Sequence, residues 1–255
     1  MSKVVDELFD LSGKVAVITG GSRGLGREMA LAFADRGADI VISSRKQDAC
    51  AATAAEVAER SGREAFALSA DVGDWGACDA LIDAVYERVG RVDVLINNAG
   101  MSPLYPSLEE VGESAFDKVI AVNLKGPFRL TAALGPRMAA DGGGSILNIS
   151  SIASVRPAPE FLPYAAAKAG LNALTEGFAK AFGPSVRVNG IIAGPFLTDI
   201  SRSWDLDVVA AHARATMALG RVGRPEEIIG AALYFASSAS SYSTGAMLRL
   251  DGGTP

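Results

Sequence analysis

Short apolar runs alternate with longer amphipathic segments along almost the whole chain. In the longer segments apolar residues recur every three or four positions, which predicts helices. The apolar runs predict strands over 14–19, 39–43, 65–70, 92–96, 145–150, 186–192 and 246–250. Helices are expected over 25–36, 47–60, 75–89, 162–182 and 225–237. Two more should fill 108–140, with Gly112 near their junction, whereas 196–219 should be irregular to helical.

The predicted strands are continuously apolar, as in Val94-Leu95-Ile96, rather than alternating. Such runs are typical of parallel strands that are buried on both faces. Strands that alternate with helices imply right-handed crossovers and an α/β doubly wound sheet. We find neither a repeat nor a linker in the 255 residues, so we predict a single domain over 1–255, with a lid at roughly 196–219.

Composition and charge argue against several classes of protein. Hydrophobic residues make up 49% and charged residues 21%, which argues against disorder. The formal net charge of -5 disfavours a nucleic-acid partner. No apolar run approaches the ~20 residues of a membrane span, and the first residues lack a signal-peptide core. The two cysteines, Cys50 and Cys78, match no metal spacing, so we expect no metal and a cytoplasmic location.

A glycine-rich segment follows the first predicted strand and opens the first helix. Its residues are Gly20, Gly21, Ser22, Arg23, Gly24, Leu25 and Gly26. Glycines allow a sharp turn and a close approach to a pyrophosphate, which a helix N-terminus then attracts. The segment lacks the Gly-Lys-Ser/Thr of a nucleotide triphosphatase loop. We therefore predict dinucleotide binding, the alternative being a tight turn that merely tolerates glycine.

The end of the second strand favours NADP(H) over NAD(H). NAD sites usually place an acidic residue there for the ribose 2′-hydroxyl. Here Ser44 and Arg45 stand at that point, and the first carboxylate is Asp48. Arg45 and Arg23 can bind a 2′-phosphate, since a guanidinium suits its geometry. The alternative is two ordinary surface arginines.

Two further strand ends carry candidate cofactor contacts. Asp71-Val72 ends the third strand, where Asp71 can accept a hydrogen bond from adenine or cap the next helix. The fourth strand ends in Asn97, Asn98, Ala99 and Gly100. These small residues leave room for a flat cofactor, although a plain strand-exit turn would look the same.

Tyr164 and Lys168 are four residues apart in a predicted helix, and therefore on one face. An ammonium near a phenol lowers its pKa from about 10, which suits a general acid/base near neutral pH. Ser151 ends the fifth strand, at the edge where such sheets bind ligands. A ketone that accepts hydride becomes an alkoxide, which Ser151 can bind and Tyr164 can protonate. The alternatives are a solvated Tyr-Lys pair and a turn or capping role for Ser151.

In combination these motifs resemble the short-chain dehydrogenase/reductase family. The resemblance spans about 11–253 in the family's order. It rests on the glycine-rich turn, Asn97 to Gly100, Asn123, Ser151, Tyr164-x-x-x-Lys168, Arg187-Val188-Asn189 and Asp251-Gly252-Gly253.

The resemblance implies a Rossmann-like, seven-stranded parallel sheet and hydride transfer between NAD(P)(H) and a carbonyl or alcohol. It implies that Tyr164 is the acid/base, that Ser151 orients the substrate, that Lys168 binds the ribose and tunes Tyr164, and that Asn123 holds a relay water. It also implies cofactor contacts at Gly194, Phe196 and Thr198. One departure is Ala193-Gly194-Pro195, where the family has Pro-Gly, so the geometry of the loop from Phe196 is open.

Substrate contacts are expected from 101–106, 152–162 and the lid. Their apolar residues predict a small-molecule substrate with an apolar body: Met101, Leu104, Tyr105, Ile152, Val155, Phe161, Phe196 and Trp204. Arg156 and Arg202 can alternatively meet an acidic tail.

We predict an NADPH-dependent carbonyl reductase, or alcohol dehydrogenase in the reverse direction. One alternative is a 3-oxoacyl-[acyl-carrier-protein] reductase, in which Lys125 and Arg129 would meet the carrier. Others are a silent NADP-binding scaffold or redox sensor, and a dehydratase or epimerase on the same fold. Small residues follow Tyr164 on its helix, and the family associates there, so we expect a homotetramer or homodimer: Ala165, Ala166, Ala169, Gly170 and Ala173.

Overall fold

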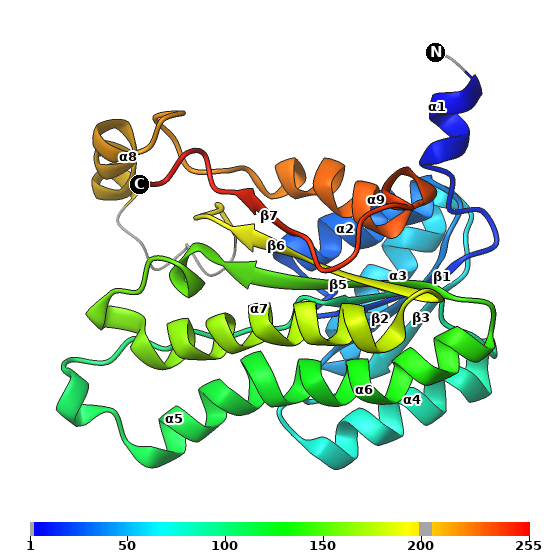
Figure 1. Ribbon diagram of the computed structural model, residues 1–255, viewed down its shortest axis with the longest axis horizontal. Coiled ribbons are helices and arrows are strands. Elements are labelled where there is room, and N and C mark those ends of the chain that lie inside the picture. Colours follow the sequence, from blue (N-terminus) through cyan, green and yellow to red (C-terminus); the bar gives the residue numbers. More distant parts are fainter. Residues whose placement is uncertain (1–2, 199–205) are drawn as a thin grey trace.

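The computed structural model describes residues 3–198 and 206–255, and within them all strands join one parallel sheet (Figure 1). The order across the sheet is β3-β2-β1-β4-β5-β6-β7. The strands are β1 (Val15–Thr19), β2 (Asp39–Ser44), β3 (Ala65–Ser69), β4 (Val94–Asn97), β5 (Gly144–Ser151), β6 (Val186–Ala193) and β7 (Met247–Leu250). The predicted doubly wound, seven-stranded architecture is confirmed, with strand ends within two residues of the expected ones.

Helices cover both faces of the sheet (Figure 1). One face packs on α2 (Gly24–Asp35), α3 (Gln47–Ser61) and α9 (Ile229–Ala236). The other packs on α4 (Trp75–Val89), α6 (Gly126–Ala140) and α7 (Leu162–Phe182). Successive strand residues point to opposite faces, so Ile18 enters the first core and Val17 the second. Burial on both faces explains the continuous apolar runs of the sequence.

The segment 108–140 differs from the prediction of two helices. A 3₁₀ turn (Leu108–Glu110) ends before Gly112, which precedes α5 (Glu113–Ile120). From there the helical backbone continues through a π-helical turn (Ala121–Lys125) into α6. A single π turn is too short to leave a period of its own in the apolar pattern, so the sequence pattern does not reveal it.

The remaining described elements lie at the two ends of the sheet. An additional helix, α1 (Lys3–Leu8), was not predicted and lies near the N-terminus, away from the carboxyl ends of the strands (Figure 1). At the carboxyl ends, α8 (Leu206–Thr216) forms part of the predicted lid. Short 3₁₀ turns occupy Ile152–Ser154, Pro159–Phe161, Pro225–Ile228 and Ser238–Ser240. Trp204 and Arg202 of the predicted lid fall outside the described residues.

The strand order reverses between β1 and β4, and the ends of these two strands are joined by polar contacts. Thr19 Oγ1 accepts hydrogen bonds from the backbone N–H groups of Asn98 and Ala99, both at 3.1 Å. Asn98 Nδ2 donates to Thr19 O at 2.9 Å. In open α/β sheets the crevice outside such a reversal binds ligands. The fold therefore puts the glycine-rich turn and the Asn98-Ala99-Gly100 segment at one crevice.

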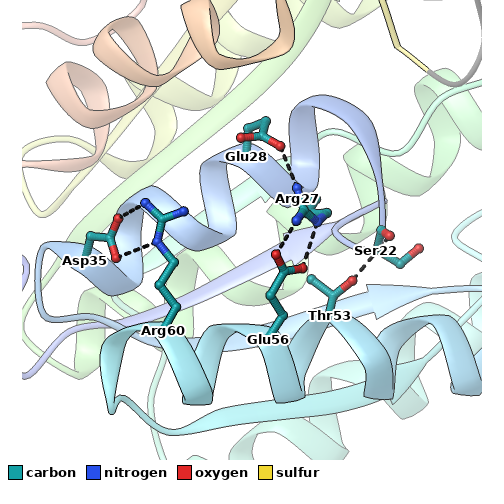
Figure 2. A network of polar contacts seen from close by, with 7 residues as sticks. All are labelled: Ser22, Arg27, Glu28, Asp35, Thr53, Glu56 and Arg60. Carbon is teal, nitrogen blue, oxygen red and sulfur yellow. Dashed lines mark hydrogen bonds and ion pairs between the residues drawn. The ribbon is translucent and has the colours of Figure 1, made fainter.

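Ion pairs fix α2 against α3, behind the glycine-rich turn (Figure 2). Arg27 Nε donates to Glu56 Oε2 at 2.8 Å, and Arg27 Nη1 pairs with Glu28 Oε1 at 2.7 Å. Farther along the same helices, Arg60 binds Asp35 through two hydrogen bonds. Bidentate pairs of this kind add geometric specificity. They hold the start of α2 at a fixed distance from α3.

Candidate active site

The glycine-rich turn adopts a backbone that other residues would strain. Gly20 and Gly24 have φ values of 63° and 52°, in the left-handed region. A Cβ on Gly26 would overlap with Gly20 O and stand 2.6 Å from Asn98 Nδ2. The turn thus needs glycine at these three positions, either for its backbone conformation or for close approach. A turn that merely tolerated glycine would have no such need.

The amino end of α2 presents backbone N–H groups beside this turn. Arg23 is the N-cap in extended conformation, and its side chain makes no capping hydrogen bond. The first i→i−4 bond of the helix runs from Arg27 N to Arg23 O, at 3.2 Å. The N–H groups of Gly24, Leu25 and Gly26 precede it, which is the arrangement that binds anions at helix N-termini. Behind the turn, Ser22 O accepts a hydrogen bond from Thr53 Oγ1 at 3.3 Å (Figure 2).

The end of β2 carries the candidate phosphate contacts. Arg45 and Arg23 are exposed, and Ser44 is half-buried. Ser44 Oγ lies 3.1 Å from the Sγ of Cys50, which is buried in α3. Arg45 is close enough to contribute to the lowered pKa of Asp71 at the neighbouring strand end.

Asp71 is engaged by other groups of the chain and does not cap α4. Asp74 is the N-cap of α4, accepting from Ala77 N at 2.7 Å. A hydrogen bond from Lys118 Nζ to Asp71 Oδ2, at 2.7 Å, is the main cause of the low pKa of Asp71. Asp71 Oδ1 accepts from Gly73 N at 2.9 Å. Val72 is buried and packs closely on Gly126 at the start of α6.

Asn123 lies in the π turn and is fully buried. Its Nδ2 donates to Met101 O at 2.8 Å and to Val119 O at 2.9 Å, while its Oδ1 accepts from Met101 N at 3.2 Å. A Cβ placed on Gly100 would stand 3.0 Å from Asn123 Oδ1 and 3.7 Å from Lys168 Nζ. Asn123 therefore braces the loop after β4 at a point next to Lys168.

Ser151, Tyr164 and Lys168 meet at the carboxyl end of β5 and the start of α7. The Ser151 hydroxyl lies near enough to the Tyr164 phenol to lower its pKa, and its Oγ accepts a hydrogen bond from Ala153 N at 3.2 Å. Lys168 Nζ lies 5.7 Å from the centroid of the Tyr164 ring and donates to Ile149 O at 2.8 Å. Pro163 is the second residue of α7, in the first turn, where a missing N–H costs nothing. Residues that are far apart in the chain thus form one polar cluster.

The electrostatics of this cluster differ from the expectation that Lys168 sets the pKa of the phenol. Burial raises the pKa of Tyr164, and the lowering contribution comes from the hydrogen bond with Ser151. Burial also lowers the pKa of Lys168 to about 8, because the charged form loses its hydration. Both shifts favour the neutral forms of the two groups.

Three residues that the sequence patterns do not single out support Ser151. Asn172 of α7 accepts from Ser150 Oγ at 2.6 Å and donates to Ser154 Oγ at 2.8 Å. Ser154 Oγ in turn donates to Ser151 O at 2.6 Å. Asn172 lies four residues after Lys168, which was the only available signal, because an isolated Asn in a helix usually faces solvent.

The loop after β6 approaches the glycine-rich turn. Gly194 N donates to Leu250 O at 2.9 Å, and a Cβ at Gly194 would meet Asp251 at 2.6 Å. Phe196 is buried and forms an isolated bridge with Gly223. Thr198 Cβ lies 3.4 Å from the Cβ position of Gly24. The shifted proline at position 195 therefore leaves the loop beside the crevice.

The two expected substrate loops are joined by Tyr105. Its Oη hydrogen-bonds to Pro159 O and accepts from Leu162 N at 2.9 Å. Leu104 beside it is exposed, and Phe161 is half-buried. Arg156 is exposed, and its Nη1 donates to the neighbouring Val155 O at 3.0 Å. The loop after β4 is thus fixed to the start of α7, next to Tyr164.

Known proteins resemble this chain over almost its whole length. The family model described as "Enoyl-(Acyl carrier protein) reductase" matches residues 20–255. The short-chain dehydrogenase/reductase astE of Aspergillus oryzae is 36% identical over 253 residues, which cover 97% of each chain. This chain belongs to the short-chain dehydrogenase/reductase family. It is an oxidoreductase that acts on alcohol and carbonyl groups.

Solved structures of family members match over nearly the whole chain. A 3-oxoacyl-(acyl-carrier-protein) reductase of Agrobacterium tumefaciens with NADP bound is 33% identical, with a TM-score of 0.92 over 98% of this chain and 97% of that one. A 7α-hydroxysteroid dehydrogenase complexed with NADH is also 33% identical, with a TM-score of 0.93 over 100% and 98%. These relatives thus include proteins with either cofactor and proteins that act on different classes of substrate.

No helix within 3–198 and 206–255 is long and apolar enough to cross a membrane. In the same part of the chain, His, Cys, Asp and Glu side chains form no group of three that could hold a metal ion.

Proposed function

We propose that this family member is an NADPH-dependent carbonyl reductase, which runs as an alcohol dehydrogenase in the reverse direction. The observation that carries the proposal is the cluster of Ser151, Tyr164 and Lys168, in which the Ser151 hydroxyl lies near the phenol and Lys168 Nζ lies 5.7 Å from the centroid of its ring. A hydroxyl and a phenol at one point are the donors that a developing alkoxide needs. Their place outside the carboxyl ends of the strands is where ligands bind in such sheets.

The crevice has the shape and donors that a dinucleotide requires. Gly20, Gly24 and Gly26 leave a concave turn that a Cβ would fill, and the amino end of α2 offers N–H groups to a pyrophosphate. The nearby Ser22, Leu25, Asn98, Ala99 and Gly100 would line the same cofactor, with Asp71 and Val72 at the adenine. Gly194, Phe196 and Thr198 would lie at the nicotinamide. Bound there, the cofactor would supply or accept the hydride.

The protein's own groups then handle the substrate oxygen and its proton. The Ser151 hydroxyl donates a hydrogen bond to the carbonyl oxygen, which orients it. Tyr164 Oη gives its proton to the alkoxide in reduction and takes one from the alcohol in oxidation. Lys168 Nζ holds the ribose and favours the phenolate when it is protonated. Asn123 holds the loop after β4 beside Lys168, where a relay water can restore the proton.

The preference for NADP(H) over NAD(H) is part of this proposal. Arg45 directly follows β2, where Ser44 takes the place of an acid, and its guanidinium is exposed. Arg23, also exposed, lies in the glycine-rich turn, which meets the end of β2 through a hydrogen bond from Gly21 N to Ser43 O at 3.2 Å. A 2′-phosphate would gain charge-assisted hydrogen bonds from the two arginines, whereas NADH offers only a hydroxyl. Relatives that bind NADP support the preference, and one that binds NADH shows that the family allows either.

One of the two cationic residues that would meet an acyl carrier, Arg129, is already engaged in an ion pair. Arg129 pairs with Asp79 and lies over the Trp75 ring, with Cζ 4.8 Å from the centroid. Lys125 remains exposed on the π turn. A carrier would have to compete with the Arg129 ion pair. We therefore place small ketones ahead of carrier-bound substrates.

We also propose a cytoplasmic homotetramer or homodimer. Ala166, Ala169 and Ala173 are exposed along α7, and small residues permit close helix contact. The exposed Phe128 of α6 lies next to Phe178 of α7, with ring centroids 5.6 Å apart. A reducing compartment suits two buried free cysteines.

Replacing Tyr164 by Phe tests the proposed chemistry. We expect a fall in kcat of about 10²–10⁴-fold in ketone reduction, because the proton donor is lost. The NADPH dissociation constant, from a fluorescence titration, should change little. A variant that keeps its turnover would refute the mechanism. Wild-type protein that binds NADPH but leaves every ketone tested unreduced would instead favour a silent scaffold.

A further inference from the structure

A cavity of about 190 Å³ lies beside Tyr164, between the loop after β4, α5 and the start of α7. Its walls are mainly apolar and include Leu104, Tyr105, Val111, Val119, Phe161 and Tyr164. Val119 is buried, and its carbonyl oxygen accepts the hydrogen bond from Asn123. The cavity is therefore built on the same braced helix as the candidate active site.

Hydrogen bonds at two points of the loop after β4 keep this cavity in shape. The Tyr105 hydroxyl bridges Pro159 O and Leu162 N, so the covering loop is attached to the start of α7. Asn123 holds the same loop at Met101 through two hydrogen bonds. A preformed apolar cavity binds apolar groups without the entropic cost of ordering its walls.

The volume limits what the cavity can hold. An apolar protein cavity of about 150 Å³ accommodates a benzene molecule. A volume of about 190 Å³ fits a six-membered ring or a branched group of similar size. A steroid nucleus or a long acyl chain would extend well outside it.

The charge at the cavity sets a second limit. Glu110 is the one charged residue among the lining residues, all of which are described. Its carboxylate accepts a hydrogen bond from Ser107 Oγ at 3.0 Å and is exposed to solvent. A substrate carboxylate or phosphate near this rim would meet a like charge, which disfavours binding.

We infer that this cavity holds a compact, uncharged apolar group of the ketone substrate, about the size of a cyclohexyl ring, while the carbonyl lies at Tyr164. The inference rests on the carbonyl reductase proposed above and assigns its substrate class. The reductase then prefers neutral cyclic or branched ketones to anionic or long-chain ones. Ala115 of α5 lines the cavity and is the position at which its volume can be reduced.

The first test compares two variants that each introduce a phenylalanine on α5. Both positions are exposed on α5, but only Ala115 lines the cavity, so Ala115→Phe fills it and Ser114→Phe puts the same ring outside it. The ratio of kcat/KM for cyclohexyl methyl ketone to that for butanone should fall about tenfold in Ala115→Phe, since about two buried methylenes lose their site. Ser114→Phe should keep the wild-type ratio within about twofold. NADPH titration and the melting temperature establish that both variants fold.

The second test concerns charge. Wild-type enzyme should reduce cyclohexyl methyl ketone about tenfold more efficiently than 4-acetylcyclohexane-1-carboxylate, by kcat/KM, and Glu110→Gln should narrow that gap at low salt. Equal ratios in Ala115→Phe and Ser114→Phe, or a gap unaffected by Glu110→Gln, would overturn the inference. Continued reduction of butanone in that case would leave the proposed function intact. No reduction of any ketone would refute the proposed function itself.

Discussion

Lys168 illustrates how burial changes the chemistry of a single residue. Its side chain is 3% exposed, and its Nζ donates to Ile149 O, a neutral acceptor. Burial lowers its pKa from 10.5 to about 8. The folded protein therefore binds this proton less tightly than the unfolded chain does.

This shift predicts a pH-dependent stability. Between pH 8 and 10.5 the unfolded chain still holds the Lys168 proton that the folded protein has released, so stability rises with pH in this window. Relative to Lys168→Met, the free energy of unfolding of the wild type should gain up to about 3 kcal/mol. Urea unfolding at a series of pH values measures it, and the comparison cancels the titration of Tyr164. A difference that stays constant across the window would contradict the assigned pKa.

At the scale of elements, glycines divide into those that the fold needs and those that it tolerates. Gly26 lies in the first turn of α2 against Gly20 O and Asn98, with no space for a Cβ. Gly177 in α7 is exposed and has nothing within 4 Å of its Cβ position. Spacing in the sequence identifies the first through its motif and says nothing about the second.

The two glycines give opposite predictions for replacement by alanine. Gly26→Ala should lower the free energy of unfolding by about 1–3 kcal/mol and weaken NADPH binding, because the β1–α2 turn must open. Gly177→Ala should raise stability by about 0.5–1 kcal/mol, since alanine orders a helix at less entropic cost. Chemical denaturation of both variants measures the effect. Equal changes at both sites would show that close approach at the turn is unimportant.

Most of the element order was predictable from apolar periodicity, because each strand and helix buries a face that the pattern records. The π turn around Asn123 was not, since five residues are too few to leave a period of their own in the apolar pattern. The alternative in which Asp71 caps α4 was wrong, because Asp74 is the N-cap. Asp71 and Asp74 both precede α4, and only the backbone decides which side chain reaches Ala77 N.

At the scale of the whole molecule, a bound dinucleotide should stabilise the fold. A ligand that binds only the folded state at 100 times its dissociation constant adds about 2.7 kcal/mol. For a chain of this size that raises the melting temperature by roughly 5–10 °C. At equal concentrations NADPH should give a larger shift than NADH, because in the proposed site Arg45 and Arg23 would bind the 2′-phosphate.

Arg45→Ala should remove most of the difference between the two cofactors, whereas Lys46→Ala, at the adjacent exposed position, should preserve it. Thermal denaturation with each cofactor is the measurement. A larger shift with NADH in the wild type would overturn the cofactor preference and leave the family assignment intact. The single domain, the cytoplasmic location and the homotetramer stay predictions.

The sequence by itself determined the layered α/β fold, the glycine-rich turn and the Tyr164–Lys168 pair. All three are local or periodic, so they can be read within a short stretch of chain. Tertiary structure decided what lies next to them. The proximity of Ser151 to Tyr164, the support of Ser154 by Asn172, and the contact of Tyr105 with Leu162 join segments that are separate in the chain. Periodicity records that a face is buried, but the strand order and the backbone path choose its partners, and with them the depth at which Lys168 is buried.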